Sequence, residues 1–558
     1  MAETKEWTLM FFFAGDNALS PVIVSQLKAI KDAGFQENID VVVHFDPNEK
    51  GTPTRIYDVN RERKRDPRLP NTMIGDGSDP FVRNMEEDSI KPDTIDKNAG
   101  HASRAMIHAL QNPDAINAKD ALINFLGFCR ENHQAKRYML FLVGHGMIVG
   151  NDAFLPDENP VSAITLKELE EILRPFSVNV NNDGGTFEML ALHSCSMSAI
   201  EVAYQLKDTA KYMMASEGSS FVNSWPYRQL LKKTFKHLED AKDDARMRAK
   251  ENNADQEAAA KNPDVDVQTL LEKLYYLALY NATDFMLSGY SLDLGLCSLE
   301  EEKFQGLTKQ LRELVAQLKA ALDNERGKEL ILLAHWESQS YWGESYTDLF
   351  DFCRCLRERC DKNGELQELS KACYNVMEEL KPIESEQVSE RFKKLVVHSR
   401  NFGSEYQYSH GFSVYFPWSR PIANAGNGVA EADKGILERY QKYAFTDDLK
   451  DQSWFSFLDS YFRETQRVKT RREEDGLDKS RGGEFIAART SFNPIGELSD
   501  GLPFSLPIDD PKPSPRSGLA CTCPSIKNHP KEERSVKGKR KQNVKAFSIS
   551  EELLDAFE

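Results

Sequence analysis

The sequence predicts an α/β protein with a mostly parallel central sheet that helices cover on both faces. Three observations predict this. Five short, largely apolar runs occur in the first 220 residues, amphipathic helical patterns separate them, and 40% of the 558 residues are hydrophobic, enough for a large core. Strands buried on both faces are apolar throughout, and their alternation with helices gives a layered architecture with right-handed crossovers.

The expected elements follow in chain order. The apolar strands are four to seven residues long and cover residues 7–13, 39–45, 138–143, 187–192 and 212–215. The helical patterns between them cover residues 18–33, 99–111, 118–131, 166–173 and 198–206. Residues 60–97 are rich in Arg, Asp, Pro and Gly, which is typical of an elaborated loop.

Beyond residue 220 the pattern becomes mostly helical. Residues 231–266 carry many alternating charges, which fits a charged insertion in the form of a solvated helix, a flexible segment or an exposed processing loop. Residues 267–465 continue the globular part, with helices expected at 270–286, 299–322, 346–380 and 454–465 and strands at 290–296 and 411–417. Residues 466–558 are charged, then rich in Pro, Ser and Gly, then basic, so we expect a mostly disordered tail.

Charge and cysteine content exclude several function classes. The net charge of −17 argues against a nucleic-acid partner, although the tail is basic. No apolar run approaches the roughly 20 residues of a membrane span, and the run at 7–15 lacks the basic start of a signal peptide. We therefore expect a cytoplasmic protein without membrane contact. Nine cysteines spread along the chain predict reduced thiols, and those at 353, 355 and 360 lack the spacing of a zinc site.

Two of the expected strands run into residues that could carry chemistry. The third strand is followed by Gly-His-Gly at 144–146, and the fourth by His-Ser-Cys at 193–195. Parallel strands end at the edge where α/β proteins bind ligands, so a base and a nucleophile distant in sequence can meet there. The N–H of Gly146 could face a developing oxyanion. A helix beginning soon after Cys195 would favour its thiolate, although a lone histidine or buried cysteine is more often structural.

These segments resemble the clostripain family of cysteine peptidases, in the clan of caspases, legumain and gingipains. The resemblance lies in LFLVGHG and in FEMLALHSCSMSAIEVAYQL, followed by MMASEGSSFVNSWPYRQLL, and it extends over most of residues 7–465. It implies a caspase-like α/β/α fold with residues 1–230 as the catalytic core, and an endopeptidase that cleaves proteins or peptides. It also implies that Cys195 attacks the scissile carbonyl, that His145 protonates the leaving amine, and that the amides of Gly146 and Cys195 hold the oxyanion.

One departure from the family pattern concerns specificity. Relatives usually carry an aspartate two residues before the nucleophile, where it helps to bind a basic P1 side chain, but this chain has His193 there. A neutral imidazole cannot supply the fixed charge, so a strict Arg or Lys preference is not expected. Glu217 and Asp293 are candidates to replace the acid in substrate binding, and His193 is a candidate for the pocket wall or for a structural role.

A second departure concerns activation. Relatives are made as zymogens and cut themselves at a basic residue between the histidine and the cysteine, but residues 146–166 contain no Lys or Arg. We therefore expect processing within the charged insertion, by the enzyme itself or by an activating protease, or in the basic tail. The candidate residues in the insertion are Arg246, Arg248 and Lys250.

Other functions on the same fold remain open. The chain could be an inactive peptidase-like interaction module, or a transpeptidase or amidase. By analogy with bacterial caspase-like peptidases, an active enzyme could belong to a stress or antiviral defence cascade. No cofactor or metal ligand is expected. Some relatives need calcium, but the acids at 16, 46 and 152 form no EF-hand-like loop, so calcium is not predicted.

Overall fold

The computed structural model describes ten stretches of the chain within one compact unit, Met1–Cys523. These stretches are residues 4–34, 36–48, 54–59, 116–146, 152–158, 161–281, 290–341, 345–363, 366–420 and 436–474. The expected helix at 99–111, the loop at 60–97 and the tail beyond 474 lie outside them.

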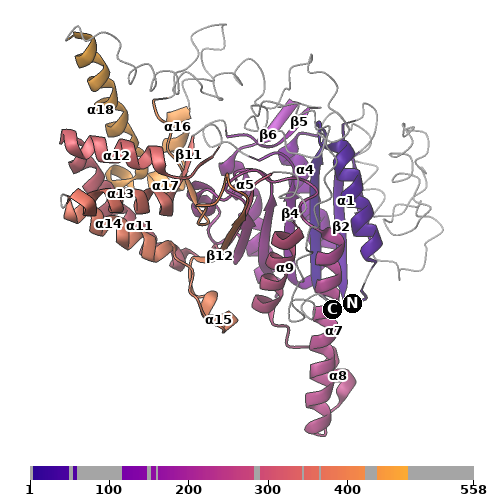
Figure 1. Cartoon of the computed structure of the whole chain (residues 1–558). Coiled ribbons are helices and arrows are strands. Elements are labelled where there is room, and N and C mark those ends of the chain that lie inside the picture. Colours follow the sequence, from indigo (N-terminus) through magenta and orange to yellow (C-terminus); the bar gives the residue numbers. More distant parts are fainter. Residues whose placement is uncertain are drawn as a thin grey trace, which may run out of the picture. The chain divides into compact units, whose positions relative to one another are not determined.

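An eight-stranded sheet forms the centre of the molecule, in the order β12-β9-β8-β7-β4-β1-β2-β3 (Figure 1). The five central strands are parallel, and β3, β9 and β12 are antiparallel to their neighbours. All five apolar runs expected in the first 220 residues are strands, as is the run at 290–296; β3 and β12 were not expected. The strands are β1 (Lys5–Gly15), β2 (Ile39–Pro47), β3 (Arg55–Asp58), β4 (Ala135–Val143), β7 (Thr186–His193), β8 (Tyr212–Ala215), β9 (Leu292–Ser298) and β12 (Val396–Phe402).

Helices cover both faces of this sheet, so the predicted α/β/α sandwich is confirmed. Side chains of β1 alternate between the two layers, with Leu9 and Phe11 in one apolar core and Met10 and Phe12 in the other. The first core contains α1 (Ser20–Ala33), α7 (Tyr227–Glu251) and α9 (Val267–Asn281) (Figure 1). The second contains α4 (Ala118–Asn132), α5 (Leu166–Asn182), α6 (Ile200–Gln205) and α11 (Glu301–Leu322).

The helix starts follow from side-chain capping. The Thr165 hydroxyl accepts the N–H of Glu168, and the Glu168 carboxylate accepts the N–H of Thr165, which forms a capping box at the start of α5. Asn117 caps α4 by accepting the N–H of Asp120.

The C-terminal half packs on the α11 side as helices and a small sheet. The predicted helices at 299–322 and 454–465 are confirmed, and the helical stretch at 346–380 forms two helices. These elements are α12 (Glu325–Glu337), α13 (Leu349–Asn363), α14 (Gln367–Leu380) and α18 (Trp454–Glu474), with β10 (Ser340–Tyr341), β11 (Tyr346–Asp348) and β13 (Ser413–Tyr415). Shorter elements are β5 (Phe154–Glu158), β6 (Val161–Ile164), α8 (Gln256–Ala260), α15 (Val388–Arg391), α16 (Ile436–Gln441) and α17 (Ala444–Asp447).

The charged stretch 231–266 takes the helical form among the three considered, and its role in processing stays a prediction. It comprises most of α7 and the whole of α8, which pack against each other. Arg246 pairs with Asp243 on the same helix and with Glu257 on α8. The last described helix, α18, continues to Glu474, beyond the end expected at residue 465.

Within the described residues, all seven cysteines are reduced, and all are buried. In the same stretches no three His, Cys, Asp or Glu side chains are grouped so that they could hold a metal ion. Among the described helices, none has both the length and the apolar character of a membrane span.

Candidate active site

The active-site candidates lie where β4 and β7 end. These strands are parallel neighbours, and their register pairs Val143 with His193. The segment containing His145 therefore leaves the sheet beside the segment containing Cys195, at the same edge. Both side chains are buried, with 8% of His145 and 2% of Cys195 exposed.

Gly146 packs directly on the backbone of Cys195. A Cβ atom at position 146 would lie 1.7 Å from the carbonyl oxygen of Cys195 and 2.8 Å from its nitrogen, so only glycine fits there. On the other side of the histidine, a Cβ at Gly144 would lie 2.8 Å from the Leu155 side chain. The carbonyl of His145 accepts the N–H of Leu155 at 3.3 Å, which holds this segment against β5.

The thiol of Cys195 meets the backbone of Ser220. The N–H of Ser220 points at Sγ at 3.4 Å, and the thiol can donate to the carbonyl of the same residue at 3.5 Å. An N–H group directed at sulfur favours the charged thiolate over the thiol. The following residue, Ser196, has φ of 56°, and its N–H bonds to the Gly218 carbonyl at 2.9 Å.

A helix begins soon after Cys195, as predicted, although α6 starts at Ile200 and not at 198. Support of the thiolate by the start of this helix stays a prediction. The amide of Ser220, in the segment that follows β8, is a hydrogen-bond donor to the sulfur that was not predicted. Sequence periodicity missed this residue because its contact with Cys195 is made only in the folded chain.

His193 is buried, and its ring is enclosed by hydrogen-bonding and stacking partners. Its Nε2 lies 2.7 Å from the Phe221 carbonyl, which can only accept, so Nε2 carries the proton and Nδ1 accepts the Tyr227 hydroxyl at 2.5 Å. Its ring stacks on Trp225, with 4.3 Å between the ring centroids. Burial lowers the pKa of His193 to about 3, so the ring is neutral and carries no charge for a substrate.

Glu217 and Asp293 lie below the surface and bind backbone groups. Asp293 accepts the N–H of Glu217 at 2.6 Å and of Gly218 at 2.9 Å, and Glu217 accepts the N–H of Gly411 at 2.6 Å. Burial raises the pKa of Asp293 to about 7. Burial, with the nearby Asp348 and Asp293 carboxyls, raises the pKa of Glu217 well above its usual value. A role in substrate binding therefore stays a prediction, while the role that the structure describes is anchoring of the backbone.

The acids considered for calcium also have local partners. The carboxylate of Asp46 accepts the Thr54 hydroxyl at 2.6 Å, and that of Asp152 accepts the N–H of Leu166 at 2.7 Å.

Comparison with known proteins assigns the chain to a family. The model of the clostripain family matches residues 11–461, which include both strand ends. The chain belongs to the clostripain family. It is accordingly a cysteine-type peptidase, a hydrolase whose substrates are proteins or peptides.

Individual members of the clostripain family are distant in sequence. Clostripain from Hathewaya histolytica is 21% identical over 522 residues, which are 84% of this chain and 89% of clostripain. An inactive zymogen C11 protease from Parabacteroides distasonis is 16% identical, with a TM-score of 0.43 over 80% of this chain and 99% of that one. A secreted C11 cysteine protease from Bacteroides thetaiotaomicron, in complex with an irreversible peptide inhibitor, is 14% identical, with a TM-score of 0.42 over 81% and 99%.

The processing candidates of this clostripain-family chain lie far along α7. Arg246, Arg248 and Lys250 occupy its last turns, and the carbonyls of Arg248 and Lys250 accept the N–H groups of Asn252 and Asn253. Lys167 and Arg174, the basic residues between His145 and Cys195, lie in α5.

Proposed function

We propose that the chain is an endopeptidase with a Cys–His dyad, in which Cys195 is the nucleophile and His145 the proton donor. The observation that carries this proposal is the packing of Gly146 on the backbone of Cys195, where β4 and β7 end as paired neighbours. Membership of a cysteine peptidase family supplies the reaction class. The dyad requires no third acid.

The proposed reaction begins with attack of the Cys195 thiolate on the carbonyl carbon of the scissile peptide. A C–S bond forms, and the carbonyl electron pair moves onto oxygen, where the N–H groups of Gly146 and Cys195 hold the negative charge. The C–N bond then breaks as His145 gives its proton to the leaving amine, which leaves a thioester. Water gives a proton to His145 while its oxygen attacks the thioester, and the thiolate departs with the bond pair.

For specificity, we propose that the P1 preference is not restricted to Arg and Lys. A neutral, buried His193 supplies no charge to a guanidinium, and the carboxyls of Glu217 and Asp293 accept backbone N–H groups. A peptide library varied at P1 tests this: comparable cleavage after neutral and basic residues is expected, and cleavage only after Arg and Lys would contradict it.

For regulation, we propose that the enzyme is made as a zymogen and that proteolysis activates it, by itself or by another protease. Cleavage at Arg246, Arg248 or Lys250 would require the last turns of α7 to unfold, so the basic tail is the better candidate. A cytoplasmic location and a place in a stress or antiviral defence cascade stay predictions.

One experiment tests the dyad directly. Cys195→Ala and His145→Ala should each abolish hydrolysis and prevent covalent labelling by a peptidyl ketone. Cys360→Ala is the matched control, because burial raises the pKa of that thiol to about 12 and makes it unreactive. N-terminal sequencing of the wild type and the Cys195→Ala variant shows whether cleavage depends on the thiol.

The alternatives give different results. Ligated peptide products would indicate a transpeptidase on the same fold. If limited proteolysis of the whole chain produced neither labelling nor hydrolysis, the chain would be an inactive interaction module. Hydrolysis that persists in the Cys195→Ala variant would exclude the proposed dyad.

A further inference from the structure

Four consecutive backbone N–H groups beside the thiol each have a defined acceptor. The N–H groups of Glu217 and Gly218 bond to the two oxygens of Asp293, at 2.6 and 2.9 Å. The next N–H, of Ser219, bonds to the Tyr406 hydroxyl at 3.2 Å, and the fourth, of Ser220, points at Cys195 Sγ at 3.4 Å. Three amides are thus held by distant side chains, and the fourth is directed at the sulfur.

From this we propose that Asp293 and Tyr406 are positioning residues for the nucleophile. They fix the backbone of residues 217–219, and this orients the amide of Ser220 towards the sulfur of Cys195. The inference rests on the proposed role of Cys195. It assigns Asp293 to the support of the thiol instead of to the P1 side chain.

A carboxyl side chain at position 293 matches the two N–H groups that it binds. Two successive N–H groups need two acceptors at the same place, and each of the two oxygens of an Asp side chain can accept one of them. Gly218 is also required, because a Cβ there would lie 2.5 Å from the Tyr406 ring and 3.0 Å from Asp293 Oδ1. The absence of a side chain lets both anchors approach the same segment.

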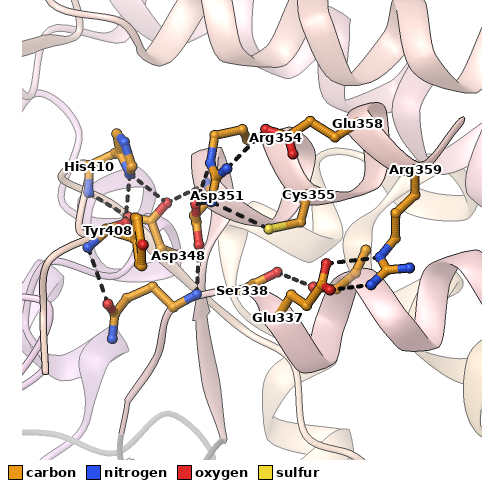
Figure 2. A network of polar contacts seen from close by, with 12 residues as sticks. Glu337, Ser338, Asp348, Asp351, Arg354, Cys355, Glu358, Arg359, Tyr408 and His410 are labelled. Carbon is orange, nitrogen blue, oxygen red and sulfur yellow. Dashed lines mark hydrogen bonds and ion pairs between the residues drawn. The ribbon is translucent and has the colours of Figure 1, made fainter. Parts of the chain in front are cut away.

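The loop that carries Tyr406 is itself held in place from the C-terminal half. The N–H of His410 bonds to Asp348 at 2.5 Å and that of Tyr408 bonds to Gln339 at 3.3 Å. Figure 2 shows Asp348 beside Asp351, and Asp351 forms an ion pair with Arg354. The side chain of Tyr406 therefore approaches Ser219 from a fixed loop.

The same loop is joined to the nucleophile segment at a second place. Gly411 has φ of 108°; its N–H bonds to the Glu217 carboxyl at 2.6 Å, and its carbonyl accepts the Ser198 hydroxyl at 2.7 Å. Ser198, three residues after Cys195, and Glu217, in the segment that contacts the thiol, are thus both bonded to one loop of the C-terminal half. Loss of a single anchor should loosen the Ser220 amide without removing the loop.

Two conservative variants test the proposal in the full chain. Asp293→Asn keeps the size of the side chain but leaves one of two N–H groups facing an NH2 group, and Tyr406→Phe removes only the hydroxyl. Their matched controls are Asp264→Asn and Tyr374→Phe, both on exposed side chains. If Asp293→Asn fails to fold, Tyr406→Phe carries the test.

The first measurement is the rate at which iodoacetamide alkylates Cys195 between pH 5 and 9, followed by mass spectrometry of the peptide that contains it. Both variants should move this pH profile to higher pH and slow alkylation about tenfold at neutral pH. The reason is that the thiolate loses a hydrogen-bond donor, which raises the pKa of the thiol. The controls should match the wild type. Alkylation needs no peptide substrate, so it tests the positioning role even if the proposed peptidase role of Cys195 fails.

The second measurement is the kinetics of peptide cleavage with several P1 residues. Both variants should lower kcat about ten- to a hundredfold for every P1 residue with little change in KM, and the double variant should lose less than the product of the two single losses. A rise in KM confined to Arg and Lys substrates, with unchanged alkylation, would instead make Asp293 a substrate ligand. If the folded Asp293→Asn and Tyr406→Phe proteins were alkylated at the same rate as the wild type, the proposal would be overturned.

Discussion

At the scale of single residues, glycine is required where two strand ends touch. Gly146 lies so close to the Cys195 backbone that any side chain would overlap it. The sequence predicts that the N–H of Gly146 faces a developing oxyanion, and the structure adds a packing reason for glycine within the protein itself. The same close packing brings the amide of Gly146 to the segment of the nucleophile.

Gly146→Ala should therefore reduce peptide hydrolysis about a hundredfold or more, because the histidine segment must move away from Cys195. The comparison is Gly127→Ala in α4, where an added Cβ meets no atom within 4 Å. That change should leave hydrolysis intact and raise the free energy of unfolding by about 0.5–1 kcal/mol. Steady-state kinetics and urea unfolding measure both; a fully active Gly146→Ala enzyme would refute the close packing.

His193 shows what residue type alone could not decide. Its position two residues before the nucleophile allowed a place in the pocket wall or a structural role. The structure adds that Phe221, Trp225 and Tyr227 surround the ring after folding. These residues follow β8, and no local sequence pattern links them to His193.

At the scale of elements, the short helix α6 joins the nucleophile segment to the C-terminal half. Its Glu201 is fully buried, and one carboxyl oxygen accepts both the N–H of Tyr415 at 2.9 Å and the hydroxyl of Tyr440 at 2.7 Å. Burial raises the pKa of Glu201 from 4.5 to about 7. The folded protein thus binds a proton more tightly at this site than the unfolded chain does.

The sign of the resulting pH dependence follows from that difference. Between pH 4.5 and 7 the folded state holds the extra proton, so the free energy of unfolding falls as pH rises. Glu201→Gln keeps the accepting oxygen but cannot ionise. Between pH 4.5 and 8, the free energy of unfolding of the wild type should therefore fall by about 3 kcal/mol more than that of the variant. Urea unfolding of both proteins at several pH values measures it; parallel stability curves would show that Glu201 does not titrate in this way.

At the scale of the whole molecule, the C-terminal helix is connected to the active site through β13. In α18, Trp454 donates its indole N–H to the Tyr415 carbonyl at 2.9 Å. At the other end of β13, the N–H of Ser413 bonds to the Ser198 carbonyl at 3.0 Å, close to Cys195 in the sequence. Hydrogen bonds through β13 therefore connect α18 with the segment that follows Cys195.

Trp454→Ala should lower the free energy of unfolding by about 3–5 kcal/mol, because it leaves a cavity in a core that α18 and Phe416 share. Hydrogen exchange should speed up together in α18 and β7 if they unfold as one unit. Trp336→Ala, at a side chain that is 41% exposed, should cost about 1 kcal/mol or less. Faster exchange in α18 alone would mean that the two halves unfold separately.

The sequence by itself determined the parallel strands, most of the helices and the strand ends where His145 and Cys195 lie, because hydrophobic periodicity and strand-end chemistry are local patterns. Only the tertiary structure decided that the Ser220 amide faces the thiol, that His193 is neutral and enclosed, and that Asp293 and Tyr406 anchor one segment. Those contacts join residues remote in sequence, and their energy depends on burial and on donor–acceptor geometry that exist only after the chain has folded.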